Sequence, residues 1–184
     1  MVAIMRVPGR KVWLTVEQAG AMLELAKSRR LRDYYLMMLL RYSLRIGEVV
    51  GGRTLHGIRT MDLRENGVHV RGKGGTERFI HLPRAFSAEL ARLSPRTPGE
   101  RLFPMTERNA EYFVKAYARK AGVPDWEYIS PHRLRAFFAT DLKDRGYDPF
   151  TIRDMMRHKN VATTNTYVGP PTPAKQAQIV EGLN

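Results

Sequence analysis

The stretch between residues 58 and 82 constrains the fold most, because its residue pattern differs from that of the chain on either side. Apolar and polar residues alternate through three short segments, 58–63, 68–71 and 78–82. The turn sequences Glu65-Asn66-Gly67 and Gly72-Lys73-Gly74-Gly75 separate these segments. Alternation around glycine-rich turns is typical of antiparallel strands. We therefore expect one small three-stranded antiparallel sheet.

The remainder of the chain has the patterning of helices. Thr15 and Gln18 form a capping box ahead of apolar residues at helical spacing, and the stretch 31–44 is apolar enough for a buried helix. Ser130-Pro131 and Asp148-Pro149 are each a cap followed by a proline in the first helical turn. Further helices are expected at 85–94, 106–121, 130–146, 149–158 and 173–182, with a short turn or helix at 161–167. The fold class predicted is α+β, mostly α-helical, in one domain.

Charge narrows the class of partner. The 184 residues include 31 Lys and Arg against 18 Asp and Glu, for a formal net charge of +13. Such an excess favours a polyanionic partner, most commonly nucleic acid. The absence of cysteine excludes disulfides, thiolate metal sites and a cysteine nucleophile, and it suits a reducing compartment such as the cytoplasm. The longest apolar run, Tyr34–Leu40, is too short to span a membrane, and we expect no membrane association.

Two basic residues in the first half of the chain are candidates for a site. Arg45 follows the apolar stretch and precedes Glu48, which is compatible either with a structural ion pair at a helix end or with a functional arginine. Lys73 occupies the tip of the second glycine-rich turn. A lysine there is usually a solvated turn residue, although a hairpin tip can also deliver an ammonium to a ligand bound outside the sheet.

Four residues in the second half complete the candidate set. His132 and Arg135 are three apart just inside a helix N-terminus, where a cation is unfavourable unless an anion lies nearby. His158 ends the next helix, where a histidine can simply complement the helix dipole. Tyr167 follows nine residues later, in a polar context that does not require a core aromatic. It is either a half-buried anchor or a nucleophile.

Taken in order, these residues resemble the signature of the tyrosine recombinase (phage integrase) family, R…K…HxxR…H/W…Y. The matching stretches are 43–49, 70–78, 130–142 and 156–168, so the resemblance covers the chain from about residue 13 to residue 170. It implies a helical catalytic domain of the DNA breaking-rejoining type with a small sheet. We expect residues 1–12 to be a lead or linker and 13–184 to be the catalytic domain.

The resemblance also implies a reaction: cleavage of one DNA strand through a 3′-phosphotyrosyl intermediate, in a site-specific recombinase or integrase. Tyr167 would be the nucleophile, and Arg45 and Arg135 would hold the scissile phosphate. Lys73 would protonate the leaving oxygen, His132 would act as acid or base, and His158 would donate a hydrogen bond. Glu48 would orient Arg45. No cofactor, metal or ATP is expected to take part.

Three departures from the family pattern are visible. The tripeptide Met156-Arg157-His158 stands where the family usually has Leu-Gly-His, and Ala136 stands where a histidine is common. The helical DNA-binding domain that usually precedes the catalytic domain has no counterpart in the short stretch before Thr15. The chain is expected to be either the catalytic part of a longer protein or a minimal member of the family.

The expected partners are double-stranded DNA and other copies of the chain, as a monomer when free and a tetramer on paired DNA sites. The helix at about 173–182 would be exchanged between protomers or would cover its own core. The expected location is the cytoplasm, in association with the nucleoid. Two alternatives stay open: a type IB topoisomerase-like DNA relaxation activity, and a non-catalytic DNA-binding relative.

Overall fold

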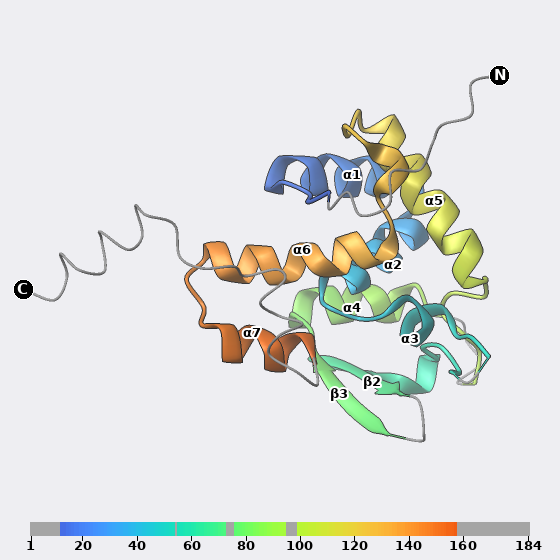
Figure 1. Cartoon of the computed structure of the whole chain (residues 1–184). Coiled ribbons are helices and arrows are strands. Elements are labelled where there is room, and N and C mark those ends of the chain that lie inside the picture. The colour runs from blue at the N-terminus through green and yellow to red at the C-terminus, as the bar shows by residue number, and fades with distance from the viewer. Residues whose placement is uncertain (1–11, 54, 73–75, 95–98, 158–184) are drawn as a thin grey trace, which may run out of the picture. The chain divides into compact units, whose positions relative to one another are not determined.

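The computed structural model describes residues 12–53, 55–72, 76–94 and 99–157. The chain divides into two compact units, Met1–Phe137 and Phe138–Asn184. Figure 1 shows the helices and the sheet. Within the described part of the chain, no helix is both long enough and apolar enough to cross a bilayer.

The first helix, α1 (Val16–Arg29), begins with the capping box that the sequence predicts. The Thr15 hydroxyl accepts from the Gln18 backbone N–H at 3.2 Å, and the Gln18 side chain accepts from the Thr15 backbone N–H at 3.0 Å. These bonds satisfy two groups that a helix N-terminus otherwise leaves unpaired. The apolar face of α1 is buried, as the spacing of its residues predicts.

The apolar stretch 31–44 is not one helix, and the prediction was wrong at its end. Helix α2 (Leu31–Arg41) stops because Ser43 takes a left-handed conformation with φ 67°. The Ser43 N–H then bonds to the Leu40 carbonyl at 3.1 Å, and the Leu44 N–H bonds to the Leu39 carbonyl at 3.2 Å. This is the Schellman arrangement that ends many helices. A separate five-residue helix, α3 (Ile46–Val50), follows directly.

The three-stranded antiparallel sheet is confirmed, in the order β1-β2-β3. Its strands are β1 (Leu63–Arg64), β2 (Gly67–Arg71) and β3 (Glu77–His81). The first strand is much shorter than the predicted 58–63. The reason is Asp62, whose carboxylate accepts the Arg59 backbone N–H at 2.8 Å and closes a 3₁₀ turn in place of a strand.

Ile58, at the start of that predicted strand, contacts a different part of the chain. Its carbonyl accepts the Leu102 N–H at 2.9 Å, and Arg59 forms an isolated antiparallel bridge with Arg101. The segment before the sheet is therefore extended, but it pairs with the loop that follows α4. This pairing ties the region after α3 to residues that lie more than 40 positions further along the sequence.

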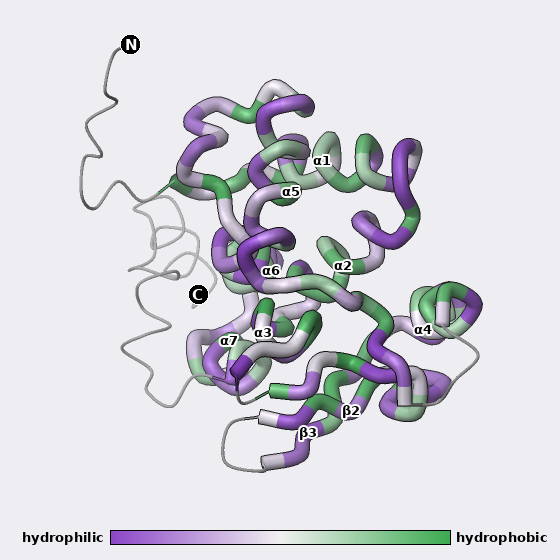
Figure 2. Tube along the Cα trace, turned by 90° about the vertical axis from the view of Figure 1, so that its right-hand side faces the viewer, coloured by the Kyte–Doolittle hydropathy of each residue, from purple (hydrophilic) through white to green (hydrophobic). Residues whose placement is uncertain are grey.

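The helices predicted at 85–94, 106–121, 130–146 and 149–158 are confirmed within one or two residues. Helix α4 (Arg84–Arg92) packs against β1 and β2, and α5 (Glu107–Lys120) begins at a Thr106 cap and contacts α1 and α3. Helix α6 (Pro131–Asp144) directly follows Ser130, whose carbonyl accepts from the Arg133 and Leu134 N–H groups. Along the tube in Figure 2, hydrophilic and hydrophobic residues alternate through these helices, as expected of elements with one buried face.

The core of the first unit is drawn from all of its helices and from β2. Its largest fully buried side chains are Phe103, Met22, Leu36, Met37, Leu39, Leu40, Leu44, Ile58, Leu90, Ile129 and Leu134. One polar contact crosses this core: the Tyr117 hydroxyl on α5 donates to the Asp33 carboxylate on α2 at 3.0 Å. Burial beside that carboxylate raises the pKa of Tyr117 to about 12.

The described part of the second unit contains the end of α6 and helix α7 (Pro149–Met156). Asp148 caps α7 by accepting from the backbone N–H groups of Phe150 and Thr151 at 2.8 and 3.0 Å, as the Asp-Pro sequence predicts. A small apolar cluster of Ala139, Ile152 and Met156 lies between these two segments. The predicted helices at 161–167 and 173–182 lie outside the described residues.

Candidate active site

Arg45 and Glu48 form a pair at the N-terminus of α3. The Arg45 Nη1 donates to Glu48 Oε1 at 3.1 Å, and the Arg45 backbone N–H donates to Glu48 Oε2 at 2.7 Å. The Glu48 side chain is only 5% exposed, whereas that of Arg45 is 48% exposed. The pair lies at a helix end, as the structural alternative predicts, but only its carboxylate is buried. The guanidinium is half exposed, which is also compatible with a functional arginine.

The backbone around Arg45 explains its placement. The Schellman turn at Ser43 reverses the chain at the end of α2 and buries Leu44 completely. Arg45 then has an extended conformation, with φ −81° and ψ 149°, and is the N-cap residue of α3. Because Leu44 anchors one side of it and Glu48 the other, the Arg45 backbone has little freedom. An arginine held in this way presents its donors in one direction, which suits the binding of a phosphate.

The C-terminus of α3 is held by a residue that the sequence did not single out. The Arg101 Nη1 donates to the Val50 carbonyl at 3.1 Å. Nothing in the sequence around Arg101 indicates this role, because the bond joins residues 51 positions apart and only the folded chain brings them together.

Helix α6 carries His132 and Arg135 in its first turns. Arg135 is 4% exposed, whereas His132 as a residue is exposed. Partial burial of the imidazole lowers the pKa of His132 below its usual value of 6.5, and the positive charges of Arg133 and Arg135 lower it further. At neutral pH the imidazole is therefore uncharged and can accept a proton.

Neighbouring contacts hold the start of α6. The Arg133 guanidinium stacks on the Trp13 ring, 5.6 Å from its centroid, and Arg41 at the end of α2 stacks on Phe137 in the same way. These two cation–π contacts join the first turns of α6 to α2 and to the chain ahead of α1. All four of the predicted site residues that the structure describes, Arg45, Glu48, His132 and Arg135, thus belong to the first unit.

Lys73, His158 and Tyr167 lie outside the described residues. The base of the hairpin that carries Lys73 is described, however. The Gly72 N–H bonds to the Thr76 carbonyl at 2.7 Å, and Arg71 pairs with Glu77 at 3.0 Å. These contacts close β2 and β3 on either side of residues 73–75.

The residue before His158 has an unusual backbone. Arg157 ends α7 with φ 56° and ψ 43°, in the left-handed region that favours glycine. The family usually has a glycine at this place in its Leu-Gly-His tripeptide. Arg157 therefore adopts, at this position, a backbone conformation that is typical of glycine.

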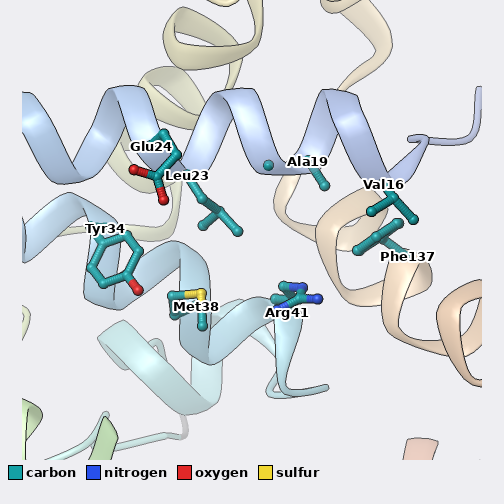
Figure 3. A pocket seen from close by; sticks show the side chains of 9 residues that line it. Val16, Ala19, Leu23, Glu24, Tyr34, Met38, Arg41 and Phe137 are labelled. Atoms are coloured by element: carbon teal, nitrogen blue, oxygen red, sulfur yellow. The ribbon is translucent and has the colours of Figure 1, made fainter.

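A groove of about 230 Å³ lies in the first unit, apart from these residues. Figure 3 shows its lining, with Ala19 and Leu23 from α1, Met38 and Arg41 from α2, and Phe137 from α6. None of the predicted site residues lines it. The predicted site residues that the structure describes lie instead at the start of α3 and in the first turns of α6, so the groove is not the candidate site.

Comparison with known proteins identifies the family. The model of the phage integrase family matches residues 12–171. The chain is 33% identical over 152 residues to the tyrosine recombinase XerC of Staphylococcus saprophyticus, covering 74% of this chain and 49% of that protein. It is 29% identical over 167 residues to the tyrosine recombinase XerA of Thermococcus kodakarensis, covering 84% of this chain and 56% of that protein.

Solved structures of tyrosine recombinases and integrases have the same fold as this chain. The crystal structure of XerA recombinase superposes with a TM-score of 0.72 at 27% identity, over 95% of this chain and 66% of that chain. The catalytic domain of bacteriophage HP1 integrase, at 17% identity, matches in fold with a TM-score of 0.66, over 91% of this chain and 94% of that chain. The chain spans about half the length of the curated relatives it matches. It belongs to the phage integrase family, the tyrosine recombinases.

Proposed function

We propose that residues 13–184 form the catalytic domain of a site-specific recombinase that cleaves and rejoins DNA strands through a 3′-phosphotyrosyl intermediate. The observation that carries the proposal is the Arg45–Glu48 pair. In this pair, a buried carboxylate binds a half-exposed arginine, at the position where the family signature has its first arginine.

In the proposed reaction, the Tyr167 hydroxyl oxygen attacks the scissile phosphorus. A bond forms between that oxygen and phosphorus, and the bond from phosphorus to the 5′-oxygen breaks. Arg45 and Arg135 bind the two non-bridging oxygens, on which negative charge builds in the transition state. Because the phosphodiester energy is kept in the covalent link, the free 5′-hydroxyl of a partner strand can reverse the step without ATP.

Two proton transfers accompany this step. A phenol has a pKa near about 10, so the attack at neutral pH requires a proton acceptor close to Tyr167. The lowered pKa of His132 supports its role as that acceptor. Lys73 at the hairpin tip donates the proton to the departing 5′-oxygen, and His158 donates a hydrogen bond to the phosphate. In this scheme side chains supply every charge and proton, and no metal ion takes part.

We further propose that the chain is a monomer when free, binds double-stranded DNA, and assembles into a tetramer on paired DNA sites, in the cytoplasm and in association with the nucleoid. The +13 net charge supports contact with a DNA backbone. Structures of other family members, the Tn1549 transposon integrase and the XerH recombinase, contain DNA.

The test uses a nicked suicide duplex, in which the cleaved end diffuses away and traps the covalent intermediate. We expect a protein–DNA adduct that resists denaturation and disappears in Tyr167→Phe. Tyr112→Phe is the matched control, because Tyr112 is 78% exposed on α5 and lies outside the family signature. It should form the adduct at the wild-type rate.

The fate of the adduct then separates the enzymatic alternatives. Joining of the trapped strand to a second duplex supports recombination, whereas relaxation of supercoiled DNA without strand exchange would support a topoisomerase-like activity. If no adduct forms on a duplex that the protein binds specifically, both enzymatic functions are overturned and a DNA-binding role is left.

A further inference from the structure

We propose that Arg101 is a positioning residue that holds α3, and through α3 the Arg45 guanidinium, in the geometry needed for DNA cleavage. This inference rests on the proposed function. It adds a residue outside the family signature, on a segment between the sheet and α5 that neither the sequence pattern nor the proposed mechanism uses.

Helix α3 is too short to be stable without contacts at its ends. It has five residues, Ile46–Val50, which is a little over one helical turn. Nucleating a single turn costs more conformational entropy than its hydrogen bonds return, so a helix of this length depends on contacts at its ends. At the N-terminus those contacts are the Glu48 carboxylate and the turn that buries Leu44.

The C-terminus of α3 also needs contacts, because the last carbonyls of a helix lack N–H donors from a following turn. The Gly47 carbonyl accepts from the Gly51 N–H at 3.0 Å, and the Val49 carbonyl accepts from the Ile58 N–H at 3.0 Å. The Val50 carbonyl accepts from the Arg101 guanidinium at 3.1 Å. Of these three bonds, the last is the one made by a side chain, so a substitution can remove it without changing the path of the backbone.

Arg101 is itself held in place by backbone contacts. Its backbone bridges to Arg59, and the neighbouring Leu102 N–H bonds to the Ile58 carbonyl at 2.9 Å. The guanidinium passes close over Gly51, where a Cβ atom would lie 3.1 Å from Nη1. Gly51 has φ 87°, a conformation that favours glycine. The backbone at the end of α3 is thus shaped to let the Arg101 side chain reach Val50.

The contact between Arg101 and Val50 is connected to Arg45 through the single turn of α3. Glu48, Val49 and Val50 are consecutive residues of one turn, and Glu48 holds both the backbone N–H and the guanidinium of Arg45. A shift of α3 therefore moves Glu48, and Arg45 moves with it. Small displacements of a phosphate-binding arginine reduce catalysis without abolishing substrate binding.

The test compares Arg101→Ala with Arg108→Ala. Arg108 is exposed on α5, and its replacement removes the same charge without touching α3. We expect Arg101→Ala to lower the single-turnover rate of adduct formation at saturating protein by about 10- to 100-fold, with DNA affinity equal to that of Arg108→Ala. Arg101→Lys, which keeps a donor, should recover part of the rate.

A double-mutant cycle with Arg45→Lys decides how Arg101 acts. If Arg101 works through Arg45, the double variant should be no slower than Arg45→Lys alone by more than about two-fold. Multiplied losses, or a loss of DNA affinity specific to Arg101→Ala, would mean that Arg101 contacts DNA directly and would overturn the inference. The proposed function would stand in that case, because wild-type adduct formation tests it separately.

A measurement without DNA covers the case in which the variant folds poorly. Amide hydrogen exchange of Val49 and Gly51 should accelerate in Arg101→Ala and Arg101→Lys, while exchange in α1 should not change. Unchanged protection of α3 would overturn the inference whatever the activity. Absence of an adduct from the wild-type chain would overturn the proposed function and the positioning role together.

Discussion

Arg157 adopts a left-handed backbone conformation that an arginine rarely takes. Its φ of 56° and ψ of 43° place it in the region where a Cβ atom crowds the following carbonyl. Non-glycine residues in this region are concentrated near functional sites, and Arg157 directly precedes His158.

This conformation predicts a difference between two variants that both lack the guanidinium. We expect Arg157→Gly to be more stable than Arg157→Ala by about 1 kcal/mol, because only glycine adopts the left-handed conformation without strain. Chemical denaturation of the two variants measures the difference. Equal midpoints would show that the backbone at this position carries no strain.

The lowered pKa of His132 predicts how the stability of the protein changes with pH. Because its folded-state pKa is lowered, the unfolded chain binds a proton more readily, and the contribution of this residue to stability is complete only above the unfolded pKa of 6.5. As the pH falls below that value, the free energy of unfolding should decrease. The comparison is with His132→Gln, in which this part of the pH dependence should disappear.

The same group can be followed directly by NMR. The imidazole signal of His132 is identified by its absence from the spectrum of His132→Gln. In the wild-type protein this signal should titrate with a midpoint below pH 6.5. A midpoint at or above 6.5 would contradict the assignment of His132 as a neutral proton acceptor.

Helix α3 and the 3₁₀ turn before β1 begin in the same way, with a side-chain carboxylate that accepts the backbone N–H of the N-cap residue. The Glu48 carboxylate accepts the Arg45 N–H at 2.7 Å at the start of α3, and the Asp62 carboxylate accepts the Arg59 N–H at 2.8 Å at the start of a 3₁₀ turn. Both carboxylates are buried. The two differ in that Glu48 also binds the guanidinium of a predicted catalytic residue.

Matched substitutions therefore separate stability from activity. Glu48→Ala and Asp62→Ala should each lower the free energy of unfolding by about 1–3 kcal/mol, because each leaves a partly buried N–H without its acceptor. Glu48→Ala alone should also slow adduct formation. A similar slowing in Asp62→Ala, measured at a temperature at which both variants are folded, would show that the activity loss reflects general destabilisation.

The first unit is held together by contacts between residues that are far apart in the sequence. The hydrogen bond from Tyr117 to Asp33 spans 84 positions and joins α5 to α2 inside the core. The other Asp33 oxygen lies 3.8 Å from the Arg32 Nε. Removal of the Tyr117 hydroxyl leaves a buried carboxylate with one fewer donor.

We expect Tyr117→Phe to lower the free energy of unfolding by about 1–3 kcal/mol. The pKa of Tyr117, raised from 10.0 to about 12, adds a signature in alkali. The folded state keeps its proton to higher pH than the unfolded state, so this contribution to stability is complete below pH 10 and is lost as the pH rises from 10 to about 12. Tyr117→Phe should lack that loss, and a parallel decline in both proteins would contradict the assignment.

Much of the helical architecture could be predicted because its signals are local. The Thr15 capping box, the Asp148-Pro149 start and the apolar face of α1 each depend on residues within one or two turns. The break after Arg41 could not be predicted, because Ser43 takes a conformation for which its residue type gives no signal. The shortening of the first strand was missed for a similar reason, since Asp62 closes a turn within an alternating pattern.

The family, the order of the candidate catalytic residues and the excess of positive charge can be read from the amino-acid sequence, because they depend on residue identity and spacing. How Arg45 is held became visible only in the folded chain. Folding buried Glu48 while leaving the arginine half exposed, and it brought Arg101 to the far end of α3 across 51 positions. The physical reason is that burial and hydrogen bonding between distant segments follow from packing, for which the chain carries no local pattern.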